Sequence, residues 1–346
     1  MSRPLLKGAF MLKYLIKRIL QGIIVLFGVI LITFTLSTVI PADPARTWAG
    51  AKATDEQIAA ARIELGLDKP VTVQFYKYVK NLLQGDFGTS YVTRRSVATE
   101  LATRIPATLE MVFYGSFIGI VLGLVIGVLT AKYKDGPLDH IMRFLTIGSV
   151  SCPGFVSAIL LQLVFYNILH ILPLGGRLDT INTIMYEAPR ITGWLTIDTL
   201  LIGNMVLFKD AVLHLIMPAM CLAPFLAGTV ARMTRSNLLE ILSEDYILAA
   251  KSYGVSSNKV LWHHALKNSI GTTATVTSLA LATTLVGTFL VEAVFSWPGI
   301  GSFVADSVTS LDYPSIMGAT IFTTLIYLVL NLLADIIIAL DPRVTL

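Results

Sequence analysis

The chain has 346 residues, of which 55% are hydrophobic and only 14% are charged. Soluble domains carry about 25% charged residues, so this composition excludes an ordinary soluble protein. The formal net charge of +4 does not indicate a nucleic-acid partner, because the basic residues flank long uncharged runs, as they do in membrane proteins. Several of these runs are continuous and longer than about 18 residues, which predicts an all-α polytopic membrane protein in contact with lipid rather than a β-barrel.

A basic N-terminal stretch precedes the first predicted span, which covers about residues 15–40. The apolar core of this span is longer than the roughly 7–15 residues of a signal-peptide core, so we expect it to be retained as a signal-anchor. We therefore divide the chain into the N-terminus with the first span at 1–40, an external helical insert at 41–106, and a five-span core at 107–346.

The insert at 41–106 has the pattern of amphipathic helices. Thr54 and Gln57 have the spacing of a capping box, and Gly66 is suited to end that helix. The next helix carries one apolar face, and Ser96 is a candidate start for a third helix. The apolar face comprises Val71, Phe75, Tyr78, Val79 and Leu82. We expect this face to pack on the insert's own helices, with the membrane surface or a partner as alternatives.

The core is predicted to contain five further spans. They cover about residues 107–131, 141–172, 211–230, 270–291 and 316–340. The third span contains Pro153-Gly154, which predicts a kink or a break in the helix. A second external polar segment, 173–210, precedes the fourth span.

The orientation of the spans follows from the Lys and Arg residues of short loops. If both termini and the loops at 132–143 and 232–267 are cytoplasmic, these segments hold fourteen of the 26 basic residues, and the external loop 292–315 holds none. The insert is also basic, but loops of that length cross a membrane largely regardless of charge. The pattern predicts a multi-pass protein with six spans and cytoplasmic N- and C-termini.

The predicted cytoplasmic loop from Glu244 to Asn268 is the most polar part of the C-terminal half. We expect it to form two short helices, the first ending near Tyr253 with Gly254 in the left-handed position that closes a helix. Ser256 or Ser257 is a candidate cap for the second helix. This shape fits a docking element for another protein, and it equally fits a loop that only connects two spans.

The sequence carries no motif for catalysis or cofactor binding. It has no GxxxxGK[ST] phosphate loop, no HExxH and no paired CxxC, so we expect neither an enzyme nor an ATP or metal site in this chain. His263 and His264 are adjacent and point in different directions on a helix, which does not favour a metal site. Ionisable residues within the spans are scarce, with His214 and Asp335 near span ends, and this argues against an ion-coupled carrier or channel.

The fifth span carries a stripe of threonines on one helix face. Spacings of four, seven and four residues place Thr273, Thr277, Thr284 and Thr288 on that face. Their hydroxyls are suited to lining a translocation path inside a helix bundle. They are equally suited to helix packing, with each hydroxyl bonded to its own helix backbone.

The loop resembles the EAA loop of ATP-binding-cassette (ABC) importer permeases. In that loop Glu-Ala-Ala is followed by three other residues, then by Gly, and then by a helix ending in Ile-x-Leu-Pro. Ala249, Ala250 and Gly254 match this pattern, and Leu266 falls at the later Leu. Leu248 stands where the family has Glu. The residues that the resemblance assigns to contact with an ATPase subunit are Asp245, Leu248, Ala249, Ala250, Gly254 and Leu266.

Longer segments carry the same resemblance over residues 11–343. They are KYLIKRILQGIIVLFGVILITFTLSTVIPADPA, LGLDKPVTVQFYKYVKNLLQGDFGTSY, RMTRSNLLEILSEDYILAAKSYG and FSWPGIGSFVADSVTSLDYPSIMGA with the terminal LDPR. In these segments the chain is similar to the permeases of dipeptide, oligopeptide and nickel importers. The segment ITGWLTIDTLL looks closest to the dipeptide-permease B subunit.

The resemblance implies the fold of a type I ABC importer permease, with a cytoplasmic coupling helix-turn-helix. It implies ATP-driven import of di- or oligopeptides across a prokaryotic inner membrane, with a nickel or metal-chelate importer as the alternative. The implied partners are a second homologous permease subunit, two ABC ATPase subunits that bind ATP and Mg²⁺, and an external solute-binding protein. A membrane scaffold that transports nothing is an alternative of another class.

Overall fold

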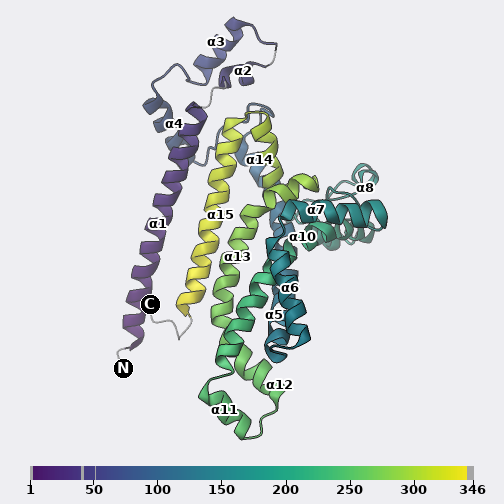
Figure 1. Cartoon of the computed structure of the whole chain (residues 1–346). Helices are drawn as coiled ribbons and strands as arrows, with labels where there is room; N and C mark the ends of the chain where they lie inside the picture. The colour runs from purple at the N-terminus through teal and green to yellow at the C-terminus, as the bar shows by residue number, and fades with distance from the viewer. Residues whose placement is uncertain (1–2, 40–42, 51, 341–346) are drawn as a thin grey trace. The chain divides into compact units, whose positions relative to one another are not determined.

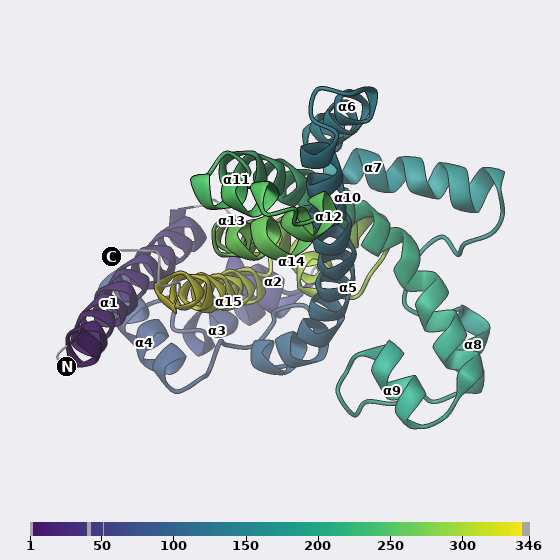
Figure 2. The same ribbon diagram turned by 90° about the horizontal axis from the view of Figure 1, so that it is seen from below.

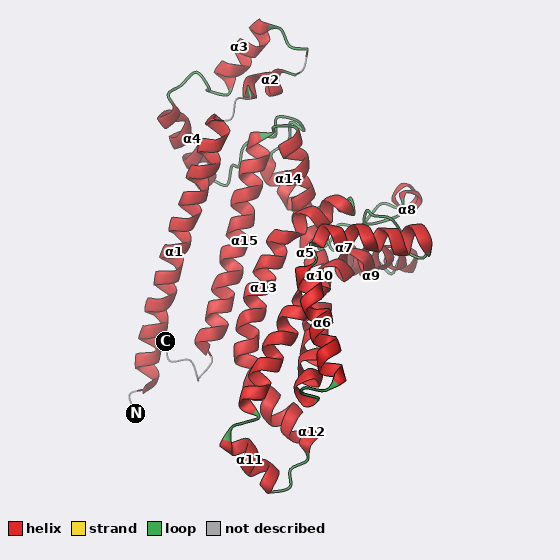
Figure 3. Ribbon diagram, viewed as in Figure 1, coloured by secondary structure: helices red, strands yellow, loops and turns green. Residues whose placement is uncertain are grey.

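The computed structural model describes residues 3–39, 43–50 and 52–340, and its ordered elements are helices joined by loops (Figures 1 and 3). Within these ranges the β-structure is limited to one isolated bridge between Thr89 and Ser96. Five of the described helices are long and apolar enough to cross a membrane, and one bent pair, counted as a single span, makes six. The predicted all-α fold is confirmed. The predicted cytoplasmic tail, 341–346, lies outside the described residues.

The chain forms two compact units. The first comprises Met1–Thr108 and Pro298–Leu328, and the second comprises Leu109–Trp297 and Val329–Leu346. Two helices, α5 (Val97–Lys132) and α15 (Tyr313–Leu340), contribute to both units. Compactness does not report on which side of a membrane a segment lies, so the predicted boundaries at residues 40 and 106 stay predictions.

The first unit contains the insert and the first span. Its helices, besides parts of α5 and α15, are α1 (Arg3–Val39), α2 (Pro44–Ala49), α3 (Asp55–Glu64), α4 (Val71–Leu83) and α14 (Ile300–Thr309). The capping box of α3 is confirmed, since the N–H of Gln57 donates to Thr54 Oγ1 (3.3 Å) and the N–H of Thr54 donates to Gln57 Oε1 (2.9 Å). Gly66 follows α3 with a φ of 71°, as expected for a residue that closes a helix.

The apolar face of α4 packs mainly on helices outside the insert. The rings of Phe75 and Tyr78 lie 5.1 and 5.9 Å from the ring of Phe34 in α1, and the same cluster includes Tyr313 and Met317 of α15. The expectation that this face packs on the insert's own helices is wrong, because α1 and α15 supply large aromatic and apolar side chains at the site.

The third insert helix and the second span are one helix. α5 begins directly after Ser96 and continues through Pro106. A proline inside a helix costs about 3 kcal/mol, and here it is offset by the burial of Val97 and Leu101 against Phe303 of α14. The prediction that Ser96 starts a helix is confirmed, and the predicted second span continues that helix without a break.

The second unit contains the remaining helices. They are α6 (Pro137–Ser151), α7 (Gly154–Leu161), the π-helix η1 (Gln162–Ile168), α8 (Thr180–Met185), α9 (Leu195–Leu201), α10 (Met205–Ile241), α11 (Asp245–Ser252), α12 (Ser257–Lys259), the π-helix η2 (Val260–Ala265) and α13 (Leu266–Val294). The break predicted at Pro153-Gly154 is confirmed, because the helices on its two sides meet at a bend of 103°.

Helices α5 and α10 approach each other at a row of four glycines on α5. A Cβ atom built on Gly119, Gly123 or Gly127 would lie 2.7–2.8 Å from a backbone carbonyl oxygen of α10, closer than real Cβ contacts allow. Gly115 is almost as close, with Leu222 Cβ at 2.9 Å. Small residues at every fourth position allow this backbone-to-backbone packing in membrane helices. The contact was not predicted, although the sequence GSFIGIVLGLVIG carries its signal in glycines four residues apart.

The segment 173–210 is organised around buried carboxylates. Asp198 is fully buried and accepts hydrogen bonds from the backbone N–H groups of Ile191, Thr192 and Gly193 at 3.1, 2.8 and 2.9 Å. Burial raises the pKa of Asp198, but the hydrogen bonds from Thr192, Gly193 and Ile191 outweigh it and hold that pKa below its ordinary value. The resulting stabilisation is present above the ordinary pKa of aspartate and is lost as the pH falls through the lowered value.

Glu110 of α5 ties this segment to the core of the second unit. Its carboxylate accepts hydrogen bonds from the N–H (2.9 Å) and the hydroxyl (2.7 Å) of Thr196, and it pairs with Arg177. Arg177 also donates to the carbonyl oxygen of Gly193 (2.9 Å) and lies over the ring of Trp297. The segment is therefore a folded part of the unit rather than a loose connection.

We predict that Gly123→Ala destabilises the protein by about 1–3 kcal/mol, because the added methyl group must push α10 away from α5. Thermal unfolding in detergent measures the effect. Gly287→Ala in α13 is the matched control, since nothing lies within 4 Å of the added Cβ and alanine is the better helix former. Equal midpoints for the two variants would contradict the close contact.

We predict that Asp198→Asn loosens the segment 173–210, because an amide cannot accept as strongly from three converging N–H groups. A loss of about 2 kcal/mol is expected locally, as for hydrogen bonds to a charged group. Amide hydrogen exchange at residues 191–193 measures it. The control is Asp179→Asn, which alters the exposed cap of α8. Unchanged protection at 191–193 in Asp198→Asn would refute the role given to this carboxylate.

Candidate functional site

The candidate site is the helix α11 with the turn that follows it. α11 covers Asp245–Ser252, and Gly254 follows with a φ of 79°. The N–H of Val255 donates to the carbonyl oxygen of Ala250 (3.1 Å), and the N–H of Gly254 donates to that of Lys251 (3.0 Å). This pair of bonds defines a Schellman cap. The predicted first helix and its closing glycine are confirmed.

One buried side chain anchors α11. Ile247 is fully buried in a cluster that we call the anchor cluster, whose members come from four segments of the second unit. The members are Val128 and Ala131 of α5, Leu238 of α10, Ile247 of α11, and Val260, Leu261 and Ala265 of η2. A displacement of α11 therefore acts directly on α5, α10 and the start of α13.

The opposite face of α11 is exposed. Residues three and four apart share a helix face, and Asp245, Leu248 and Ala249 satisfy this spacing and are all exposed, Leu248 by 51%. Ala250 is half-buried, and Gly254 is exposed at the turn. Five of the six residues assigned to ATPase contact thus lie on or beside one surface.

Leu266 lies elsewhere. Its side chain is partly buried and packs against the anchor cluster at the start of α13. The structure thus places Leu266 beneath α11 instead of on the exposed face, and its assignment to direct ATPase contact stays a prediction.

The second helix of the loop is longer than expected. Ser256 is its N-cap residue, without a side-chain capping bond, and the helix continues through α12 and η2 into α13. The prediction of a short second helix is wrong, because the apolar residues Val260 and Leu261 are buried in the anchor cluster and keep the backbone helical. The π-helical turn at Val260–Ala265 marks the join, and such turns are frequent at functional sites.

Polar contacts fix the same end of the unit. Lys132 at the end of α5 donates to Asn258 Oδ1 (3.0 Å), and Asn268 of α13 donates to the hydroxyl of Tyr246 in α11 (2.7 Å). In Figures 1 and 2, α11 and α12 lie together at the end of α13. The loop is therefore bound to three helices rather than suspended between two.

A buried ion pair joins α10 to the bent span. Arg235 donates from Nε to Asp139 Oδ1 (2.9 Å) and from Nη2 to Asp139 Oδ2 (2.6 Å), and Asp139 is fully buried. This fork-to-fork geometry is the strong, directional form of the interaction. Neither residue was singled out from the sequence, where only the basic RMTR motif before the loop could have suggested the pair.

The threonine stripe of α13 lies inside the second unit. Thr273, Thr277, Thr284 and Thr288 are each at most 9% exposed. Thr277, Thr284 and Thr288 donate to carbonyl oxygens of their own helix, and Thr273 accepts from Asn237 of α10 (3.4 Å). The stripe is thus buried, with Thr273 in contact with α10, and this favours the packing alternative. A role in translocation stays a prediction.

The two histidines of the loop do not form part of a larger metal-binding group. Their rings meet edge to face, with centroids 5.2 Å apart. Among the described residues no three His, Cys, Asp or Glu side chains are grouped as metal ligands.

Comparison with known proteins places the chain in a family. Residues 98–346 match the family described as binding-protein-dependent transport system inner membrane component. Residues 11–112 match the N-terminal region that belongs with it. The two matches together extend over nearly the whole chain.

Several relatives are similar over their full length. The chain is 41% identical to the probable D,D-dipeptide transport system permease protein DdpB of Escherichia coli, covering 93% of this chain and 94% of that protein. It is 37% identical to the di/tripeptide transport system permease protein DppB of Pseudomonas aeruginosa, covering 96% and 99%. It is 34% identical to the glutathione transport system permease protein GsiC of Salmonella paratyphi A, again covering 96% and 99%.

Among solved structures, an inward-facing form of the MetNI methionine ABC transporter is similar, with a TM-score of 0.49 and 17% identity. The similarity covers 69% of this chain and 94% of that chain.

The family match covers the greater part of the chain, and the relatives match over nearly their full length. The chain is therefore a multi-pass membrane protein that belongs to the family of inner membrane components of binding-protein-dependent transport systems.

Proposed function

We propose that this chain is one of two permease subunits of an ATP-driven importer of di- or oligopeptides. The relatives at 41% and 37% identity are named as dipeptide and di/tripeptide permeases, and they match over 93% and 96% of this chain. In this proposal the chain lies in a prokaryotic inner membrane with both termini in the cytoplasm. A second homologous permease completes the translocation path, and an external solute-binding protein delivers the peptide.

The energy enters through the exposed face of α11. Two ABC ATPase subunits bind ATP and Mg²⁺, and one of them receives Asp245, Leu248 and Ala249. The observation that carries this proposal is the contrast between that exposed face and the buried Ile247 on the other side of the same short helix. A push on one face is transmitted by close-packed side chains to three long helices, because packed interiors are hard to compress.

Leu248 changes the expected chemistry of docking. The family pattern has a glutamate at this position, whereas Leu248 is apolar and half exposed. Because about half of the Leu248 side chain is still exposed, its full burial in a partner's cleft stabilises the contact by about 1 kcal/mol. Docking here therefore relies on apolar burial at Leu248, with Asp245 supplying the acid one turn earlier.

We predict that Ala249→Arg strongly lowers the rate of transport-coupled ATP hydrolysis while leaving the fold intact. The arginine would project from an exposed face that must enter an ATPase cleft, so the coupled rate should fall at least about tenfold, equivalent to about 1.4 kcal/mol of lost contact. Co-purification with the ATPase subunits and ATP hydrolysis in liposomes, with the solute-binding protein present, measure it.

The matched control for this experiment is Ala60→Arg, which changes an exposed alanine on α3 in the insert. Gly254 is a poorer test position, because its positive φ would strain any replacement. Normal coupling in Ala249→Arg, with normal ATPase binding, would show that α11 is not the docking element.

The threonine stripe is kept as a proposed border of the path. Because all four threonines are buried here and Thr273 contacts Asn237 of α10, the proposal requires the helices packed on this face of α13 to move away in another state. We predict that Thr277→Cys and Thr284→Cys, in a chain lacking Cys152 and Cys221, react with a small aqueous thiol reagent in at least one nucleotide state. Ala282→Cys, buried on the opposite face of α13, should stay unreactive throughout. If Thr277→Cys and Thr284→Cys are also unreactive in every state, the stripe is a packing surface.

A further inference from the structure

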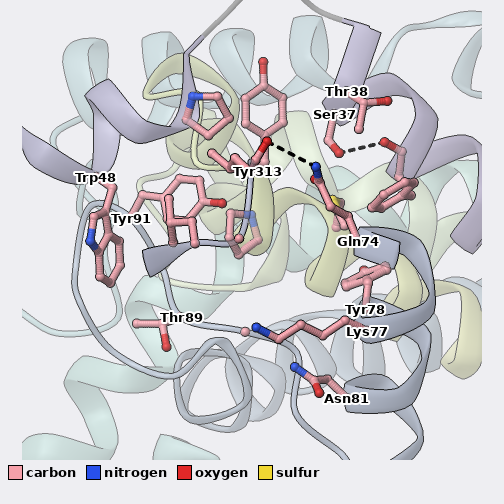
Figure 4. Close-up of a pocket in the computed structure, with 18 of the residues that line it drawn as sticks. Ser37, Thr38, Trp48, Gln74, Lys77, Tyr78, Asn81, Thr89, Tyr91 and Tyr313 are labelled. Carbon is pink, nitrogen blue, oxygen red and sulfur yellow. Dashed lines mark hydrogen bonds between the residues drawn. The ribbon is translucent and has the colours of Figure 1, made fainter. Parts of the chain in front are cut away.

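Two groups of polar side chains lie outside the proposed docking and translocation surfaces. One group lines a pocket of about 410 Å³ in the first unit, which Figure 4 shows with Gln74 and Tyr78 of α4. The side-chain amide of Gln74 donates there to the carbonyl oxygens of Leu67 and Lys69 (3.4 and 2.8 Å), so it stabilises the turn before α4. The other group lies at the start of α6 in the second unit, and we call it the α6 polar cluster. Its members are Lys132, Asp135, Asp139, Arg235 and Asn258.

Asp139 is the centre of the α6 polar cluster. Its fully buried carboxylate accepts two hydrogen bonds from Arg235 of α10, one from Nε (2.9 Å) and one from Nη2 (2.6 Å). A third bond comes from the backbone N–H of Asp135 (3.0 Å), in the turn between α5 and α6. Asp135 has a φ of 60°, a left-handed conformation that is uncommon outside glycine. The carboxylate therefore fixes both this turn and α10 to the first turn of α6.

The same turn is bonded to the loop that carries α11. Lys132, at the end of α5, donates to Asn258 Oδ1 of α12 (3.0 Å). On α10, Arg235 follows Thr234, whose Cβ would lie 2.6 Å from a Cβ built on Gly127 of α5. Arg235 also lies one turn before Leu238, a member of the anchor cluster. The α6 polar cluster is thus placed between the close contact of α5 with α10 and the anchor of α11.

The ion pair connects α6 to this end of the unit where the anchor cluster does not. The anchor cluster holds α11 on α5, α10 and η2, and none of the described residues of α6 belongs to it. Near the start of α6, Asp139 supplies the hydrogen bonds to α10. A shift of α10 at this level therefore reaches the first turn of α6 through the Asp139–Arg235 pair.

A buried ion pair contributes direction more than stability. Removing a carboxylate and a guanidinium from water costs about as much free energy as their attraction returns, and an apolar pair of similar volume is often at least as stable. Apolar contacts such as those of the anchor cluster are non-directional. The guanidinium of Arg235, by contrast, bonds both oxygens of Asp139 in parallel, which restricts the relative placement of α6 and α10.

We propose that Asp139 and Arg235 are positioning residues that fix the start of α6 to α10, so that a movement of α11 reaches the bent span as well as α5, α10 and α13. This inference rests on the proposed function, because it assigns the pair a task in coupling ATP hydrolysis to transport. The two residues contact neither the ATPase nor the peptide in this proposal, and they act through the helices that they join.

The first test is a distance measurement on the full chain, which needs no partner protein. Spin labels at Phe144→Cys of α6 and Tyr253→Cys at the end of α11, in a chain lacking Cys152 and Cys221, report the distance by double electron–electron resonance. Both positions are exposed, by 78% and 89%. The apolar double variant Asp139→Leu/Arg235→Met should shift or broaden the distance distribution by about 2 Å, the scale of helix shifts in conformational switches. Its unfolding midpoint in detergent should equal that of the unmodified chain.

Two further variants serve as controls for the distance measurement. Arg232→Met changes an exposed arginine one turn before Arg235 on α10, and it should leave the distance distribution unchanged. Arg235→Lys keeps the positive charge but cannot reproduce the two parallel bonds, so it should broaden the distribution like the double variant.

The second test places the same variants in the complex with the ATPase subunits and the solute-binding protein. The double variant should still bind the ATPase subunits, because the exposed face of α11 is unchanged. Stimulation of ATP hydrolysis by the peptide-loaded binding protein should fall about fivefold or more, the lower end of coupling between distant sites. Arg232→Met should be stimulated normally.

Four outcomes would overturn the proposal. An unchanged distance distribution in the double variant would remove the positioning role, and so would an equal change in Arg232→Met. A lower unfolding midpoint in the double variant would assign the pair to stability. A changed distribution with full stimulation of ATP hydrolysis would remove the role in coupling. Because the distance measurement uses the chain alone, it decides the positioning role even if the unmodified chain binds no ATPase, a result that would instead refute the proposed function.

Discussion

The close contact between α5 and α10 is the constraint on which the second unit depends. At Gly119, Gly123 and Gly127 the backbone of α5 comes so near to that of α10 that no side chain fits between them. In a membrane there is little hydrophobic force to hold helices together, so association depends on packing of this kind. α10 also approaches α6 closely, because a Cβ on Gly228 would lie 2.8 Å from the carbonyl oxygen of Thr146. α10 is thus the helix that α5 and α6 both use as a support.

The same arrangement connects the loop after α10 to several helices of the unit. α10 leads into α11, α11 is anchored by Ile247, and the anchor cluster includes residues of α5 and η2. The pair Arg235–Asp139 adds a second, polar connection from α10 to the bent span. α11 is therefore connected by packing to α5, α10 and the start of α13, and through α10 to α6. The proposed coupling role requires such a connection, whatever solute is carried.

The sequence predicted the local features of the fold well where a short pattern determines them. The Thr54–Gln57 capping box, the left-handed Gly254 and the break at Pro153-Gly154 all depend on residues within one turn of each other. It predicted less well where tertiary burial overrides the local signal. α5 continues through Pro106 because Val97 and Leu101 are buried, and the second loop helix continues into α13 because Val260 and Leu261 are buried.

Some residues of the candidate site could be identified from the sequence, and others could not. The exposed positions Asp245, Leu248 and Ala249 could be named from spacing and resemblance, since helix periodicity alone places them on one face. Ile247 could not, because an isoleucine in a polar loop has no local signal that tells an anchor from an exposed side chain. The direction of the threonine stripe was equally undetermined, because periodicity shows that four residues share a face but not which neighbour that face meets.

The surface around α11 carries more apolar area than a solvated loop needs. Besides Leu248, the large side chains of Tyr246 (46%), Tyr253 (89%) and Trp262 (46%) are exposed there. Aromatic residues of this kind are the commonest sources of binding energy in protein interfaces, and an exposed group of them marks a contact surface more often than chance. Since the loop also carries lysines and acids, a polar partner surface suits it better than acyl chains do. This supports the proposal that a protein covers α11. In that proposal the exposed aromatic and leucine side chains, rather than the glutamate that the family usually supplies, provide much of the docking energy.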